Sequence, residues 1–238
     1  MKLQTLLAAM LAALFAAPTL AGVFSVSPVR IYMTPRDRAV AVTLTNEGDT
    51  PVALQADINS WTQKPDGTDE LVLTDDLILS PPIIKLAPNA RQVVRLALLM
   101  PADASRQLTY RLIIREVPEA TAGKGNAIEV PIALALSMPV FITPPVAKRN
   151  VSCTLQRKDA QTAEAVCANS GTAYAQVRSA ALRRGEQVLG SFEGGIYILP
   201  DARKNIAIKS STALTTGAAE LSVTFDDGQT ASSSVTLP

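Results

Sequence analysis

Large apolar side chains occupy every even position of one stretch of the chain, between residues 128 and 142. The odd positions between them are mostly small, polar or proline, so the stretch alternates with a period of two. That period over such a length predicts an extended strand with one wholly apolar face. Its apolar positions are Ile128, Val130, Ile132, Leu134, Leu136, Met138, Val140 and Ile142.

Two prolines, Pro131 and Pro139, fall inside this stretch. Proline has no N–H to give to a sheet, so both favour a strand at a sheet edge over a central one. Soluble proteins normally avoid a long apolar edge strand, because it pairs with the edges of other chains. We therefore expect either that something covers this edge or that presenting it is the function. A long core strand of a β-sandwich is the alternative.

Short runs rich in Val, Ile, Leu and Thr recur along the rest of the chain, separated by turn sequences, and helical periodicity is nearly absent. This spacing predicts β-sandwiches. In the first half we expect strands near 23–33, 39–46, 51–61, 70–79, 91–99, 107–117 and 127–142. In the second half we expect them near 150–156, 164–169, 174–183, 187–190, 196–199, 205–209, 220–226 and 231–237.

The two series of strands predict an all-β fold of two immunoglobulin-like β-sandwich domains, arranged at an angle with a cleft between them. Thr143-Pro144-Pro145 is a stiff hinge, since prolines restrict themselves and the residues before them. We assign residues 22–144 to the first domain, with Trp61 as a buried anchor, and 145–238 to the second. A cleft between two domains is a common location for binding sites.

The N-terminus predicts export. Lys2 precedes an apolar run from Leu6 to Ala17, which is too short to span a bilayer comfortably and is followed by the small residue Ala21. We expect residues 1–21 to be a signal peptide, cleaved after Ala21 or a few residues earlier, and the mature protein to be soluble and exported.

Charge and chemistry exclude several classes of function. The 22 Lys and Arg residues nearly balance the 21 Asp and Glu residues, so no excess charge indicates nucleic acid or an anionic membrane as partner. Cys153 and Cys167 are a local pair, which in an exported protein predicts a disulfide, with two separate buried thiols as the alternative. Histidine, the commonest general base and metal ligand, is absent from the sequence. We therefore expect no catalysis, metal, cofactor or small-molecule substrate.

Six segments follow one another along nearly the whole mature chain in the order and spacing of a known family. They are Ser27-Pro28-Val29-Arg30, Thr43-Leu44-Thr45-Asn46, the pair Pro81–Pro88 and Val93-Val94-Arg95-Leu96, Arg115-Glu116-Val117-Pro118, the alternating strand, and Asn169–Tyr174. Together they resemble the periplasmic pilus chaperones of the chaperone–usher pathway. The end of the alternating strand, from Ser137 to Pro144, looks closer to the archaic, Csu-like branch of that family than to its best-known P and type 1 chaperones.

The resemblance implies a chaperone that binds pilus subunits, which are incomplete immunoglobulin folds lacking their last strand, and delivers them to an outer-membrane usher. The alternating strand would fill the subunit's gap by donor-strand complementation, a form of β-augmentation. A structural pilus subunit and a secreted immunoglobulin-like binding module are the alternatives. The donor residues implied by position are Val130, Ile132, Leu134, Leu136 and Met138.

The resemblance also implies a basic pair in the cleft that anchors the subunit's C-terminal carboxylate. Arg30 matches the first member, whereas Pro139 stands where the family has its second member, a lysine. We expect one of Arg111, Arg115 and Lys148 to replace that lysine.

Two further expectations concern domain orientation and the free protein. The family's interdomain ion pair implies that Arg95 contacts Asp226 or Asp227, with Gln107 at the position of one usual acidic partner. The apolar strand of the free protein needs protection, and a self-capping homodimer would provide it, as would gatekeeper residues or a mobile loop around residues 121–126.

Overall fold

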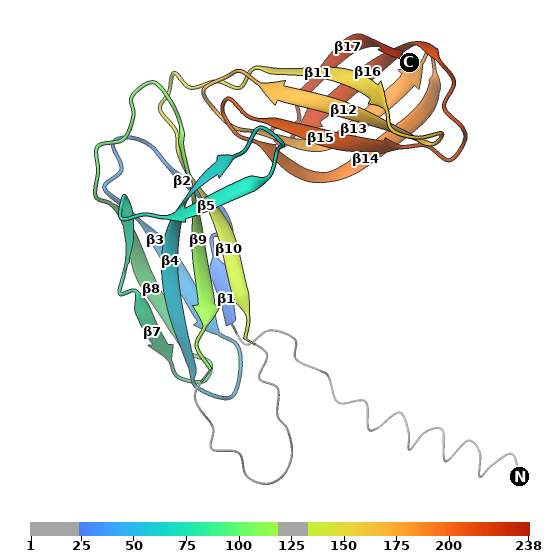
Figure 1. Cartoon of the computed structure of the whole chain (residues 1–238). Helices are drawn as coiled ribbons and strands as arrows, with labels where there is room; N and C mark the ends of the chain where they lie inside the picture. The colour runs from blue at the N-terminus through green and yellow to red at the C-terminus, as the bar shows by residue number, and fades with distance from the viewer. Residues whose placement is uncertain (1–23, 119–132) are drawn as a thin grey trace, which may run out of the picture.

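The computed structural model describes residues 24–118 and 133–238. Every regular element in these residues is a β-strand, which confirms the predicted all-β class (Figure 1). The predicted signal peptide lies outside the described residues, as do the donor candidates Val130 and Ile132. The described part of the chain contains no helix long and apolar enough to cross a membrane.

Two sheets face each other in the first half of the chain. One has the order β1-β3-β8-β6; the other has the order β2-β10-β9-β4-β5, with β7 paired to the first part of β4. Alternate side chains of both sheets, such as Leu44, Leu96 and Leu112, are fully buried between them. The strands are β1 (Phe24–Ser27), β2 (Ile31–Met33), β3 (Ala39–Asn46), β4 (Val52–Gln63), β5 (Asp69–Leu73), β6 (Leu77–Ser80), β7 (Ile83–Leu86), β8 (Arg91–Leu98), β9 (Leu108–Glu116) and β10 (Ala135–Ile142).

The second half forms a single sheet in the order β11-β12-β15-β14-β13-β16-β17. The sheet curls until β11 and β17, its first and last strands, contact each other around a second core. Figure 1 shows this domain set at an angle to the first. The strands are β11 (Val151–Arg157), β12 (Thr162–Asn169), β13 (Ala175–Arg184), β14 (Gln187–Ile198), β15 (Arg203–Lys209), β16 (Gly217–Phe225) and β17 (Thr230–Leu237).

Some predicted strand boundaries are wrong. The run at 70–79 is two strands, β5 and β6, because the chain crosses from one sheet to the other at the turn around Asp75 and Asp76. The run at 23–33 is likewise divided between the sheets, as β1 and β2. Conversely, the runs at 187–190 and 196–199 are the two ends of one long strand, β14, whose pairing with β13 shifts register.

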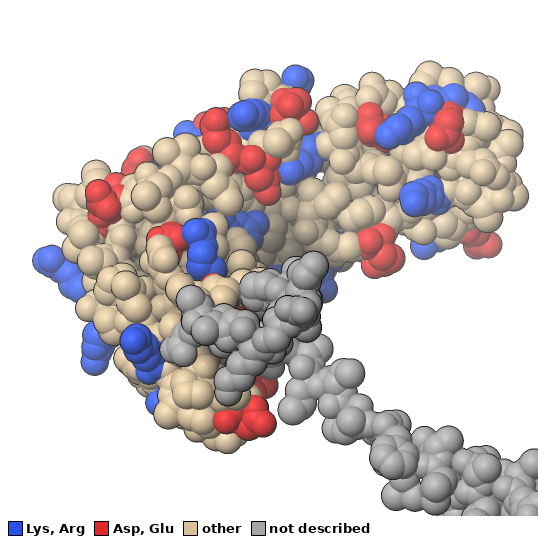
Figure 2. Space-filling model, turned by 60° about the horizontal axis from the view of Figure 1, so that its bottom comes forward, with Lys and Arg blue, Asp and Glu red and all other residues tan. Residues whose placement is uncertain are grey.

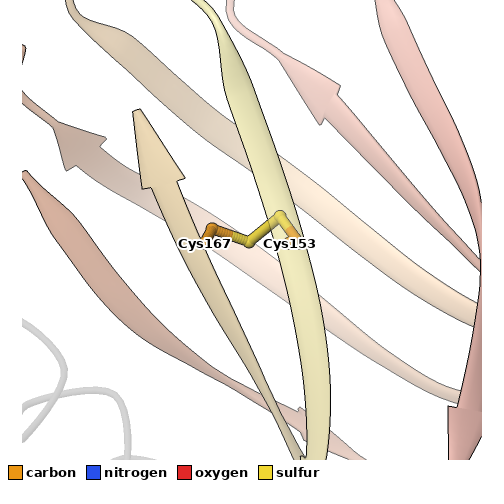
Figure 3. The surroundings of a disulfide bond; sticks show 2 residues. All are labelled: Cys153 and Cys167. Atoms are coloured by element: carbon orange, nitrogen blue, oxygen red, sulfur yellow. A yellow bond between two sulfur atoms is a disulfide. The ribbon is translucent and has the colours of Figure 1, made fainter. Parts of the chain in front are cut away.

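The predicted disulfide is present in the second domain (Figure 3). Cys153 on β11 and Cys167 on β12 lie directly opposite each other in the antiparallel ladder and are joined covalently. Cys167 is fully buried, and Cys153 packs against the same core. A link that closes a short loop of this kind stabilises a domain by about 3 kcal/mol in the chain-entropy estimate.

Candidate strand edge and interdomain anchor

Strand β10 lies at an edge of its sheet for most of its length. β9 pairs with it from Ala135 to Ile142, whereas β2 runs parallel to its other side and covers only Val140–Ile142. Among the described residues, no strand covers this side of residues 135–139. This part of the alternating stretch is therefore an edge strand, as its prolines predict.

The ladder between β9 and β10 determines which backbone groups of β10 are free. The N–H of Glu116 donates to the carbonyl of Leu134 at 2.8 Å, so the even residues of β10 are the ones whose backbone groups face β9. The N–H and C=O groups of Ala135 and Ser137 therefore point to the open side. Pro139 has only its carbonyl to present there. The open edge is a short row of donors and acceptors that an added strand can pair with.

The even side chains of β10 face the space between the two sheets, and their burial decreases toward the start of the strand. Val140 and Ile142 are fully buried and Met138 is 4% exposed, all within the first core. Leu134 and Leu136 are half-buried against the same core. Leu134 and Leu136 are thus the described donor candidates with side-chain surface to offer, whereas Met138 already fills the chain's own core.

Five aromatic rings pack where β10 meets the second domain. The ring of Phe141 stacks on that of Tyr174 with centroids 4.1 Å apart, and Tyr32 lies on Phe141 at 5.8 Å. Trp61 meets Tyr197 edge-on at 5.2 Å. Such pairs add to the burial energy of an interface. Trp61 is buried as predicted, but it packs in this aromatic cluster shared by the two domains rather than in the core of the first.

Two of the four predicted anchor residues converge on this aromatic cluster. The guanidinium carbon of Arg30 lies 5.9 Å from the centre of the Tyr197 ring, and that of Arg111 lies 5.7 Å from the same ring. Arg111 also lies over Trp61 at 3.7 Å, a cation–π contact. Burial lowers the pKa of the Arg111 guanidinium, with Asp69 opposing the shift, but an arginine keeps its charge in proteins. Two guanidinium groups with a permanent positive charge therefore lie near the ring of Tyr197.

The other two anchor candidates lie elsewhere. Arg115, further along β9, forms an ion pair with Asp57, with 3.1 Å between Nη1 and Oδ2. Lys148 is exposed, and in the described part of the chain its hydrogen bonds come from its backbone, which contacts Thr172. Within the residues that the structure describes, neither Arg115 nor Lys148 forms a cation–π contact with Trp61 or Tyr197.

Asp226 brings a carboxylate to the same place. Its Oδ2 lies 3.8 Å from Nη1 of Arg30 and accepts a hydrogen bond from the hydroxyl of Tyr174 at 3.0 Å. Burial raises the pKa of Tyr174 far above its ordinary value, and a hydrogen bond with Tyr32 adds to the shift, so the Tyr174 hydroxyl keeps its proton. Asp226 directly follows β16, so its contact with Arg30 joins the two domains.

The contact predicted between Arg95 and Asp226 is not what the structure shows. Val94 and Leu96 fill the core from β8, so the side chain between them points outward, because successive residues of a strand face opposite sides. Arg95 is accordingly exposed and forms no ion pair within the described residues. Arg30 is the partner of Asp226 instead.

Two glutamines of the first domain hold the tyrosines of the second. The Gln107 side chain, 4% exposed, accepts a hydrogen bond from the backbone N–H of Tyr174 at 2.8 Å. The Gln63 side chain donates to the carbonyl of Tyr197 and accepts from the N–H of Leu199, each at 3.0 Å. Sequence reasoning missed Gln63, because a single amide at the end of a strand carries no pattern. Both glutamines fix the backbone of tyrosines whose rings lie beside the arginine pair.

A pocket of about 440 Å³ opens between the domains, lined by Trp61, Gln63 and Arg106 on one side and by Leu199 and Asp201 on the other. Figure 2 shows the hollowed surface between the two domains, with Lys and Arg side chains beside it. Arg30 and Arg111 do not line this pocket, so the arginine pair is a separate feature of the interface. In the described part of the chain, no group of three side chains suited to metal binding comes together.

Comparison with known proteins agrees with this geometry. Residues 23–148 match the family model "Pili and flagellar-assembly chaperone, PapD N-terminal domain". Among solved structures, the CsuC–CsuE chaperone–tip adhesion subunit complex from archaic Csu pili of Acinetobacter baumannii matches with a TM-score of 0.66 and 21% identity, covering 91% of this chain and 100% of that one.

Two further structures share the fold at lower identity. The CupB2 chaperone of Pseudomonas aeruginosa has a TM-score of 0.56 and 19% identity, covering 90% of this chain and 100% of its own. A Salmonella enterica complex of the SafA pilin with the SafB chaperone has a TM-score of 0.58 and 15% identity, covering 92% and 97%. No curated protein sequence matches the chain significantly.

Proposed function

The chain belongs to the family of pili and flagellar-assembly chaperones, and on that premise we propose that it binds pilus subunits in the periplasm and completes their fold with its own strand. The subunit is then delivered to an outer-membrane usher. Residues 1–21 would direct the chain to the periplasm and be removed there. The CsuC–CsuE and SafB–SafA complexes, in which a chaperone of this fold holds a pilus subunit, support the assignment of the partner.

The observation that carries this proposal is the open edge of β10, which ends beside Arg30. β2 runs parallel to β10 and occupies the edge from Val140 onward, and Arg30 directly precedes β2. A subunit strand that pairs with residues 135–139 in the same direction would run toward the start of β2. Its C-terminal carboxylate would then reach the guanidinium of Arg30. An antiparallel strand would place its positively charged N-terminus there, so the position of Arg30 favours the parallel direction.

Arg111 is our assignment for the second member of the anchor. Pro139 stands where the family has a lysine, and Arg111 lies directly opposite Pro139 in the ladder between β9 and β10. Side chains of opposite residues share one face of a sheet at a Cβ separation of about 5 Å. Arg111 can therefore supply, from the neighbouring strand, the charge that the lysine would have supplied. Two charge-assisted hydrogen bonds to one carboxylate would fix the register of the added strand.

The donor side chains are those on the even positions before Met138. Leu134 and Leu136 are half-buried on the first core, and the sequence continues the pattern with Ile132 and Val130. An aliphatic side chain that passes from full exposure to full burial contributes about 1.5–3 kcal/mol before ordering costs, and the half-buried leucines would contribute less than that. In the absence of a subunit, a second copy of the chain that pairs with the same edge would cover it, which is the self-capping homodimer.

The test of donor-strand binding is a pull-down of the tagged protein from periplasm of cells that also express the neighbouring secreted open reading frames. Leu136→Glu places a charge where the subunit core would be, so we expect the co-purifying subunit to be lost. Ser137→Glu is the matched control: it adds the same charge to the adjacent position, on the opposite face of the strand, and should retain the subunit. Equal recovery with both variants would contradict the donor assignment.

The anchor is tested by Arg30→Ala and Arg111→Ala in the same assay. Each change removes one charge-assisted hydrogen bond, and bonds of that kind contribute about 1.5–3 kcal/mol, so capture should weaken by at least tenfold. Circular dichroism should stay native, because both side chains are at least partly exposed. Normal capture by Arg111→Ala together with weakened capture by Arg30→Ala would place the second anchor residue elsewhere.

A further inference from the structure

The free protein already holds a carboxylate beside Arg30, and it comes from the second domain. Asp226 is fixed independently of Arg30, because Tyr174 donates to its Oδ2 at 3.0 Å and its own backbone N–H donates to the carbonyl of Gln176 at 3.0 Å. Tyr174 is fixed in turn by its stack on Phe141 and by Gln107. The carboxylate of Asp226 is thus held in place by contacts other than the one with Arg30.

The contact between Asp226 and Arg30 is an attraction without a hydrogen bond. The separation of 3.8 Å between Oδ2 and Nη1 exceeds the range of a hydrogen bond but keeps the two charges close. The donors of the Arg30 guanidinium are therefore not consumed by Asp226 and can turn to another acceptor. With its side chain 33% exposed, Arg30 is also accessible from outside.

We propose that Asp226 is a resident competitor for Arg30, which takes the place of the subunit's carboxylate in the free protein and lowers the affinity of the anchor. The inference rests on the proposed function, since it needs a carboxylate ligand at Arg30. A bound subunit would bring a second negative charge to Arg30, and the two carboxylates would repel each other. Asp226 therefore weakens binding specifically through the subunit's C-terminus.

This arrangement also links the subunit to the contact between the domains. The pair of Arg30 and Asp226 joins the first domain to the second, and a subunit carboxylate that draws Arg30 away weakens it. Part of the energy of anchoring is thus offset by the loss of an internal attraction. A chaperone that must release its subunit again gains from an anchor of this kind, because the resident carboxylate takes Arg30 back on release.

The experiment uses the full mature chain and a synthetic peptide of alternating valine and threonine, made once with a free C-terminal carboxylate and once with an amidated terminus. Affinities are measured by fluorescence anisotropy for the wild type, Asp226→Asn, Asp227→Asn and Arg30→Ala. Asp227→Asn is the matched control: it removes the same charge from the next residue, whose ion pair is with Arg149 at 2.7 Å.

We expect Asp226→Asn to bind the carboxylate peptide about two- to fivefold more tightly, the range of a partly exposed charge pair. Its affinity for the amidated peptide should not change, and Asp227→Asn should resemble the wild type for both peptides. Weaker carboxylate binding by Asp226→Asn would show that Asp226 orients Arg30 for its ligand, and an unchanged affinity would show that it does not compete; either result overturns the inference.

Arg30→Ala separates this failure from that of the proposed function. Suppose that Arg30→Ala loses the preference for the carboxylate peptide while Asp226→Asn behaves as the wild type. The assignment of Arg30 as carboxylate anchor is then supported, and the proposal that Asp226 competes for it is wrong. If the wild type does not prefer the carboxylate peptide at all, Arg30 is not a carboxylate anchor, and the anchor and the competitor are both overturned, whereas donor-strand binding is tested separately by Leu136→Glu.

Discussion

The two halves of β10 share one sequence pattern but have opposite surroundings. From Val140 to Ile142 the strand is paired on both sides, and its side chains are fully buried. Residues 135–139 are paired on one side only, and the side chain of Leu136 is half-buried. Every even position is apolar in both halves, and Phe141 adds a large apolar side chain at an odd position of the paired half.

The difference lies in what stands beside the strand. β2 is three residues long, so it closes only the last part of the edge, and the second domain covers Phe141 from the other face. The buried half therefore secures the strand to the molecule, and the open half presents it. A strand held firmly at one end can offer its other end to a partner without being pulled out of its sheet.

The largest expected effect concerns the buried half. Phe141→Ala removes a fully buried ring that stacks on Tyr174, and a change of this kind costs about 3–5 kcal/mol of unfolding free energy. Chemical denaturation followed by fluorescence measures the loss. Phe141→Leu, which retains much of the volume, should cost distinctly less. A loss below about 1 kcal/mol for the alanine variant would mean that the interdomain cluster contributes little.

A smaller effect compares two neighbouring even positions. Met138 is 4% exposed in the first core, so Met138→Ala should cost about 2–5 kcal/mol. Leu136 is half-buried, and we expect Leu136→Ala to cost under about 2 kcal/mol while it weakens subunit capture more than Met138→Ala does. Equal losses of stability at both positions would remove the proposed division of the strand into a structural and a presenting half.

The sequence predicted those features that have a local signature. The alternation with two prolines indicated the edge strand, and the spacing of Cys153 and Cys167 indicated the disulfide, which joins opposite residues of two adjacent strands. Arg30 was identified through a resemblance to a family motif, and the structure places it at the interface between the domains.

Features that depend on tertiary contact were missed or misassigned. The five rings of the aromatic cluster come from strands and turns in both domains, so no spacing along the chain brings them together. The partner of Asp226 was placed at Arg95, because a sequence motif does not show on which face of β8 a side chain lies once the core is formed. The role proposed for Arg111 likewise depends on its register opposite Pro139.

The finest distinction between the two halves is in the exchange of single amide hydrogens, measured by NMR. In the open half, the N–H of Leu136 faces β9 and that of Ser137 faces the open side, so Leu136 should exchange slowly and Ser137 rapidly in the free monomer. Addition of a strand should protect Ser137 and leave Leu136 unchanged. Protection of Ser137 that rises with protein concentration alone would identify the self-capping homodimer. Slow exchange of Ser137 at every concentration would show instead that another part of the same chain covers the edge.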